Sequence, residues 1–221
     1  MINERYRKDY TGEFIVTNSA WSGGKKRVTR EWIPNTIENN HISNRAACIG
    51  STVDRHMFDF KILESHKGGL LGSLKLQTYG TGDIAKILRL DFVVEKDEED
   101  LATLIESHYY KNNIIYTTPR MCLKYPGVFY PIPFNPLLAQ PLVLPYLAAF
   151  DGHKEVFLLG YTDDEAMGQL EWSSQLGMIV TAYAGTKFYF VGMESQVPSA
   201  LREHANFEHL THREFISYCD I

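Results

Sequence analysis

Cysteine is scarce in this chain, and its spacing excludes two classes of small protein. The 221 residues contain three cysteines, Cys48, Cys122 and Cys219, with no C-x-x-C pair. An odd number of widely spaced cysteines forms neither a disulfide framework nor the paired ligands of a structural zinc site. We therefore expect the fold to be held together by burial and the chain to work in a reducing compartment.

Long apolar runs are missing as well. The longest apolar stretch, residues 137–150, is interrupted by Pro141 and Pro145. It is also shorter than the ~20 residues that a membrane-spanning helix needs. The first residues show no apolar segment of the signal-peptide type. These absences predict a cytoplasmic protein without a membrane span.

An excess of basic charge is absent from the chain as a whole. Acidic residues outnumber basic ones by 27 to 22, which gives a net charge of −5. Such a charge argues against non-specific coating of nucleic acid. The first 32 residues are nevertheless net positive, with Lys25, Lys26, Arg27 and Arg30 among them. A nucleic-acid partner for these residues is the less favoured interpretation, because runs of charge usually only solvate a surface.

The composition that is present is that of an ordinary globular protein. Hydrophobic residues make up 44% of the chain and charged residues 22%, without a bias toward disorder or a fibrous repeat. From the length and the patterns below we predict an amino-terminal β-hairpin extension with its loop at residues 1–45. A Rossmann-like α/β domain follows at residues 46–221.

The amino-terminal extension has the pattern of a β-hairpin. Residues 14–17 and 27–32 are rich in β-formers and flank the sequence Ser22-Gly23-Gly24-Lys25. Glycine tolerates positive φ and suits the tight turn of a hairpin. Pro34 is expected to end the second strand, and residues 35–45 read as a loop.

From residue 46 onward, short apolar runs alternate with helical patterns. This alternation predicts βα units and a mostly parallel sheet with helices on both faces. Strands are predicted at residues 46–49, 90–94, 113–117, 128–132 and 155–159, and helices at residues 57–64, 101–108 and 137–150. The prolines of the last helix predict a kink or a late start. A closing hairpin of residues 178–183 and 188–191 is expected next, then short helices at residues 198–204 and 211–219.

Four acidic residues, 97–100, precede the helical pattern at 101–108. Negative charge complements the start of a helix, and Asp97 is of the residue type that caps free N–H groups. We favour this structural interpretation over a cluster that binds a divalent metal.

Ligands of an open parallel sheet bind beyond the carboxyl ends of the strands, where chain order reverses. The first segment in such a place holds Gly50, Ser51, Thr52 and Arg55. Backbone N–H groups at this turn suit a phosphate, and Arg55 adds a charge-assisted contact. A single glycine matches neither the dinucleotide fingerprint nor the P-loop. A plain capped turn therefore explains the same residues equally well.

Residues 77–83 form the second predicted loop, in which glycines alternate with hydroxyl-bearing side chains. Glycines let backbone approach a ligand closely, Tyr79 offers a stacking face, and Asp83 is a candidate proton acceptor. The alternative for Asp83 is an acid at the start of a helix. The candidate binding residues of this loop are Thr78, Tyr79, Gly80, Thr81 and Gly82.

Asp163 and Asp164 belong to a third loop, which follows the predicted strand at residues 155–159. Asp163 has two interpretations of equal weight. Its carboxylate either accepts hydrogen bonds from a sugar or a base, or it caps the helix that follows.

Taken together, these loops resemble a known group. Four segments look like landmarks of the DUF115 and bacterial sialyltransferase-like group: residues 46–51 (AACIGS), 58–63 (FDFKIL), 77–80 (QTYG) and 146–161 (YLAAFDGHKEVFLLGY). The resemblance implies a Rossmann-type sugar transferase that uses a nucleotide-activated donor as its substrate, without a cofactor and often without a metal ion. Thr52, Val53 and Asp54 stand where that group is usually richer in glycine and asparagine.

The resemblance also suggests roles for particular residues. Gly50, Ser51 and Arg55 are expected to face the donor phosphate, and Asp83 is the candidate base. His41 and His56 are reserve candidates for the base because they flank the first turn. Two other classes stay open: a nucleotide-binding module without catalysis, and an interaction or assembly protein that keeps only the fold.

Overall fold

The structure is a computed structural model that describes residues 2, 4–7, 13–34, 43–50, 58–59, 61–64, 75–161 and 169–221. Its strands are β1 (Glu13–Ser22), β2 (Lys25–Pro34), β3 (Arg45–Ile49), β4 (Gln77–Thr81), β5 (Phe92–Val94), β6 (Ile114–Thr117), β7 (Tyr130–Pro131), β8 (Glu155–Leu159), β9 (Lys187–Val191) and β10 (Phe207–Leu210). Its helices are α1 (Lys61–Glu64), α2 (Gly82–Ala85), α3 (Glu98–Glu106), η3 (Tyr109–Lys111), α4 (Pro119–Lys124), α5 (Gln140–Asp151), α6 (Gln169–Ala182), η4 (Glu194–Gln196), η5 (Ser199–Glu203) and α7 (His212–Cys219).

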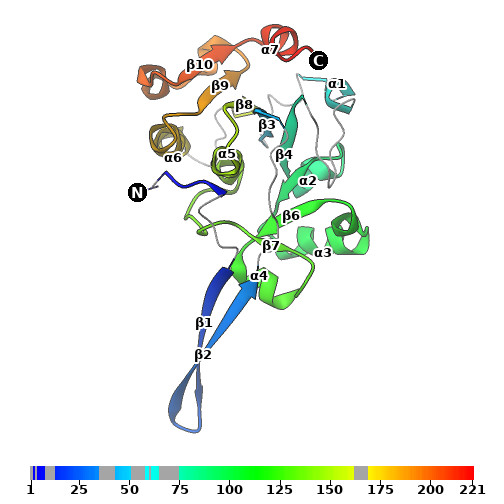
Figure 1. The fold of residues 1–221 in the computed structure, drawn as a ribbon, viewed down its shortest axis with the longest axis vertical. Coiled ribbons are helices and arrows are strands. Elements are labelled where there is room, and N and C mark those ends of the chain that lie inside the picture. The colour runs from blue at the N-terminus through cyan, green and yellow to red at the C-terminus, as the bar shows by residue number, and fades with distance from the viewer. Residues whose placement is uncertain are drawn as a thin grey trace.

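Eight strands form one parallel sheet in the order β10-β9-β8-β3-β4-β5-β6-β7, and β1 and β2 form a separate antiparallel hairpin (Figure 1). The predicted α/β class and the hairpin are therefore confirmed. Chain order runs outward from β3 to β7, returns through α5, and continues on the other side from β8 to β10. The reversal of chain order, the usual place for a ligand, lies between β3 and β8.

Helices cover both faces of the sheet. The apolar sequence of β3 contributes side chains to the core on each face. Ala46 and Cys48 pack into a core cluster with α5 and α6, while Ala47 and Ile49 pack into a second cluster with α2, α3, α4 and α7. Successive side chains of a strand point to opposite faces, so an uninterrupted apolar run is what a doubly covered strand requires.

The amino-terminal hairpin has the predicted turn. Gly23 and Gly24 adopt φ values of +60° and +75°, as the central residues of a tight hairpin turn do. Pro34 is the last residue of β2, also as predicted. The hairpin projects beyond α4 at one end of the molecule (Figure 1). The proposed domain boundary at residues 45 and 46 stays a prediction.

The prolines of α5 act as expected. The helix starts late, at Gln140, with Pro141 in its first turn and Pro145 inside it. Pro145 has no N–H group, so the carbonyl of Pro141 four residues earlier lacks its helical partner. The hydroxyl of Tyr161 donates to that carbonyl over 2.7 Å instead.

Two predictions about secondary structure are wrong. Residues 77–81, expected in a loop, form the buried strand β4. Residues 178–183 were expected as a strand of a closing hairpin, but residues 178–182 belong to α6, and Tyr183 follows the helix. β9 pairs in parallel with β8 and β10. Leu176, Ile179, Val180 and Tyr183 are fully buried at helical spacing, so α6 buries one continuous apolar stripe. No described helix is long and apolar enough to cross a bilayer.

Candidate functional site

The three predicted ligand loops begin at neighbouring strands of the sheet. β3 lies between β8 and β4, and because all three run in parallel, their carboxyl ends share one edge. Gly50, Gly82 and Gly160 lie at or just after these ends. The sequence therefore located the three segments at one place, although Ser51, Thr52, Arg55 and Asp163, with the reserve residues His41 and His56, lie outside the described residues.

Gly50 lies against the backbone of the next strand end. Its N–H donates to the carbonyl of Leu159 over 2.8 Å. A Cβ atom at position 50 would stand 2.5 Å from the carbonyl oxygen of Gly160, closer than real Cβ atoms come. Gly160 itself has a φ of +69°, a conformation that favours glycine. The close approach of bare backbone at the switch point thus requires glycine in both strands.

The side chain of Tyr161 lies beside Gly50. Its ring carbon Cδ2 would lie 3.2 Å from a Cβ atom at position 50, and its side chain is buried. The hydroxyl is anchored on Pro141, as described above. Burial raises the pKa of Tyr161 well above its usual value, so the side chain acts here as a neutral, fixed hydrogen-bond donor.

At the end of β4, Thr81 and Asp83 are joined through their side chains. The Thr81 hydroxyl donates to the Asp83 carboxylate, and Asp83, partly exposed, stands in the first turn of α2. Gly82 between them donates its N–H to Glu95 Oε2 over 3.0 Å. A Cβ atom at Gly82 would lie 2.7 Å from that same oxygen, so this glycine is required by the close approach of Glu95.

Glu95 is a residue that the sequence reasoning missed. It follows β5 directly, and only 2% of its surface is exposed. Its Oε1 accepts from the N–H groups of Lys96 and Asp97 and from Gln140 Nε2, over 2.7, 2.9 and 2.8 Å. One carboxylate therefore ties the ends of β4 and β5 to the start of α5. The sequence signal that could have identified Glu95 is its position directly after a buried strand.

Lys96 adds a cation to this edge. Its Nζ donates to the carbonyl of Leu138 over 2.9 Å. Burial lowers the pKa of Lys96 from its usual value, because desolvation disfavours the charged form.

Three of the predicted binding residues have their contacts inside the core, and their part in ligand binding stays a prediction. Thr78 bonds through its N–H and hydroxyl to Asp91 Oδ2 over 2.7 and 2.9 Å. Tyr79 is fully buried, with its ring stacked on Phe92 at 4.5 Å. A Cβ atom at Gly80 would lie 2.6 Å from a methyl group of Leu90. The exposed loop expected here does not form, because these side chains are needed inside the sheet.

The hydroxyl of Tyr79 belongs to a buried polar network. It lies 2.7 Å from Asp151 Oδ2 and 2.8 Å from His153 Nε2. Arg7 forms an ion pair with Asp151 at 2.5 Å and donates to the Tyr116 hydroxyl over 2.9 Å. Burial alone would lower the pKa of Arg7, but the Asp151 carboxylate raises it above the usual value. Asp151 and His153 end α5 and precede β8, so this network lies toward the amino edge.

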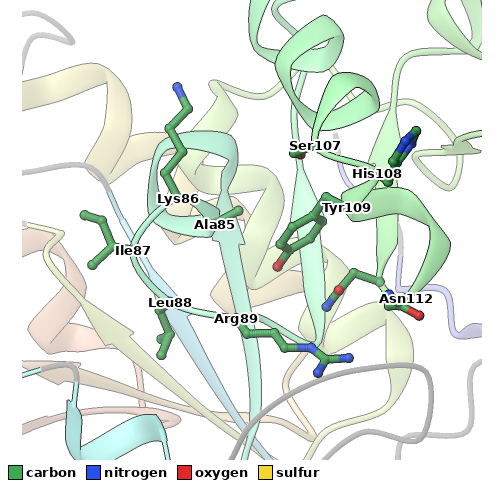
Figure 2. A pocket seen from close by; sticks show the side chains of 10 residues that line it. Ala85, Lys86, Ile87, Leu88, Arg89, Ser107, His108, Tyr109 and Asn112 are labelled. Carbon is green, nitrogen blue, oxygen red and sulfur yellow. The ribbon is translucent and has the colours of Figure 1, made fainter.

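A cavity of about 360 Å³ lies between residues 85–89 and residues 107–113 (Figure 2). These segments precede β5 and β6, so the cavity opens at the amino edge. It contains no predicted site residue. Its basic side chains Lys86 and Arg89 follow the carboxyl end of α2, where positive charge complements the helix dipole. We therefore give it no part in the candidate site.

Comparison with known proteins adds little to this geometry. No protein-family model matches the chain, and no curated protein matches it. Membership of the DUF115 group therefore stays a prediction. Among solved structures, the fold resembles an alpha-2,3-sialyltransferase from Campylobacter jejuni in its apo form. The two share 10% sequence identity over 72% of this chain and 79% of that chain, with a TM-score of 0.49. A likeness at this level does not bear on activity.

Proposed function

We propose that this protein binds a nucleotide-activated sugar at the carboxyl edge of β3, β4 and β8 and transfers the sugar to an acceptor. The observation that carries the proposal is the contact between Gly50 and Gly160 at the reversal of chain order. The N–H of Gly50 itself donates to the carbonyl of Leu159, so the proposal assigns the phosphate to the N–H groups that follow Gly50. No membrane-spanning helix is present among the described residues.

The proposed chemistry assigns a separate role to the residues at each strand end. Gly50, with Ser51, Thr52 and Arg55 after it, faces the donor phosphate and stabilises the charge of the leaving group. Asp83 takes the proton of the acceptor hydroxyl. The Thr81 hydroxyl orients the Asp83 carboxylate. Glu95 holds the N–H of Gly82 next to Asp83, and Asp163 is assigned to the sugar or the base.

Sugar transfer is preferred over other nucleotide chemistry on one ground. The segments at residues 46–51, 77–80 and 146–161 resemble the DUF115 and sialyltransferase-like group, whose donors are nucleotide-activated sugars. The edge itself favours a phosphate-bearing ligand and leaves the class of base and sugar open.

The test measures binding and turnover separately. Thermal unfolding with CMP, UDP, GDP and their sugar conjugates should raise the midpoint for one base, since a ligand at a hundred times its Kd stabilises a fold by about 2.7 kcal/mol. Arg55→Ala should reduce this stabilisation. Asp83→Asn should keep it but slow donor consumption by about 10²- to 10⁴-fold. Arg89→Ala, at the opposite edge, is the matched control. If Arg55→Ala and Asp83→Asn both leave binding and turnover unchanged, the assignment is wrong.

One observation favours a second candidate, a nucleotide-binding module without transfer. Asp83 accepts from Thr81 at the start of α2, which is the arrangement expected of an acid that only stabilises a helix start. This candidate predicts stabilisation by a nucleotide with no consumption of any donor, so the two assays above separate the candidates.

A further inference from the structure

The hairpin tip, residues 19–29, is an arm with no role in the proposed site. Strands of ten residues each, at roughly 3.3 Å per residue, make the hairpin about 33 Å long. Every side chain from 19 to 29 is exposed. Trp21 is 77% exposed and Val28 53% exposed. Exposed apolar side chains are informative where they gather on one face, because a contiguous apolar patch marks an interaction site.

The register of the hairpin gathers these side chains on one face. Trp21 pairs with Lys26, and Ser19 pairs with Val28. Cross-strand partners and alternate residues share a face, so Trp21, Val28 and Lys26 lie together. Arg27 and Lys25 occupy the opposite face. Within the described part of the chain, no third strand pairs with either edge of the hairpin.

The net charge of the arm indicates the kind of surface that covers it. Residues 19–29 carry Lys25, Lys26 and Arg27 and no acidic residue, a charge of +3, whereas the whole chain carries −5. The rest of the chain therefore carries −8. Exposed acidic side chains such as Glu99 and Glu203 belong to this acidic remainder of the chain. A nucleic acid or an anionic membrane would attract the arm but repel this acidic body.

We propose that the arm is a dimerisation arm that docks on the acidic body of a second copy of this chain. An isolated two-stranded hairpin is only marginally stable in water, so cover from a partner explains a long hairpin whose residues 19–29 are all exposed in the single chain. A two-fold arrangement lets each copy supply one basic arm and one acidic surface, and both arms are then covered.

Sedimentation velocity of the full chain tests the proposal. The wild-type protein is expected to have the mass of two chains, and its dissociation is expected to increase with salt, because part of the contact is electrostatic. The double variant Trp21→Ser with Val28→Ser should weaken association by about tenfold or more, as loss of a central apolar anchor does. The triple reversal Lys25→Glu, Lys26→Glu and Arg27→Glu should give the mass of one chain.

A second triple reversal is the control for net charge. Lys111→Glu, Lys154→Glu and Arg213→Glu change the charge by the same amount on exposed positions of the body and should leave the two-chain mass intact. Unchanged thermal midpoints in dilute solution verify that the arm variants fold. A single-chain mass for the wild-type protein at all concentrations overturns the proposal, and so does a two-chain mass for both arm variants. Mass gained only with an oligonucleotide or with anionic vesicles also overturns it. None of these results depends on nucleotide binding.

Discussion

The two edges of the parallel sheet are built in opposite ways. Toward the amino edge, Tyr79, Asp151, His153 and Arg7 fill the interior with side chains that bond to one another. At the carboxyl edge, Gly50, Gly82 and Gly160 withhold side chains so that backbone comes close to other groups.

The difference suggests that stability and ligand binding are assigned to opposite ends of the same strands. Buried polar side chains that satisfy one another stabilise a single arrangement. Under the proposed function, the N–H groups that follow these strand ends bind the phosphate of the ligand. Substitutions toward the amino edge should therefore change stability at constant affinity, and substitutions at the carboxyl edge should also change affinity.

Asp151→Ala is expected to have the largest effect. Arg7 is left buried without its counter-ion, and breaking one partner of a buried pair costs about 3–5 kcal/mol. Urea unfolding followed by circular dichroism measures the loss. Asp220→Ala, which removes a partner that is 92% exposed, is the control and should cost no more than about 1 kcal/mol. Equal losses in the two variants would contradict the assignment of Arg7 and Asp151 to a buried pair.

Gly50→Ala is expected to have the second largest effect. The added Cβ atom must displace the Gly160 carbonyl from 2.5 Å, and overpacking of this kind costs about 1–3 kcal/mol. Stabilisation by the cognate nucleotide should be lost as well. Gly177→Ala in α6 is the matched control: its Cβ atom would meet only ordinary contacts of 3.6 and 3.7 Å, and alanine favours the helix by about 0.5–1 kcal/mol. Unchanged nucleotide affinity in Gly50→Ala would separate this glycine from the ligand.

Tyr79→Phe should have a smaller effect. The ring stays stacked on Phe92, but Asp151 loses a donor at 2.7 Å. Loss of one buried hydrogen bond costs about 1 kcal/mol, or somewhat more where a charged group is left unsatisfied. Equilibrium unfolding measures the difference, and nucleotide affinity should be unchanged. A fall in affinity with wild-type stability would mean that Tyr79 reaches the ligand after all.

Glu155 gives the smallest effect, a dependence on pH. Burial would raise the pKa of Glu155, but hydrogen bonds from Tyr218 and Arg45 outweigh it and lower the pKa below the ordinary 4.5. A carboxyl group with a lowered pKa in the folded state stabilises the protein above its unfolded pKa. That contribution is lost as pH falls through the folded pKa. In Glu155→Gln, the free energy of unfolding should therefore fall less steeply as pH drops below 4.5. Unfolding at a series of pH values measures this dependence.

Local signals predicted the elements whose causes are local. Gly23, Gly24 and Pro34 define the hairpin through their own backbone preferences. Asp97 caps α3 by accepting from Glu99 and Asp100 two and three residues later. The nearness of the ends of β3, β4 and β8 was also predictable, because neighbouring parallel strands place their carboxyl ends together.

The failures have distant causes. Gly80 reads as a loop residue, yet it is glycine because Leu90 packs against it. Tyr79 reads as an exposed ring, yet Asp151, 72 residues away, bonds to its hydroxyl. Glu95 becomes recognisable only once Gly82 and Gln140 are seen to meet it. Each of these depends on a contact that no window of sequence contains.

The ion pair between Arg7 and Asp151 also has a consequence for how the chain is made. The two residues are 144 positions apart, so Arg7 is synthesised well before its partner. Contacts of such separation carry a large loop-closure cost and form late. The buried ion pair between Arg7 and Asp151 therefore forms only after α5 has been synthesised.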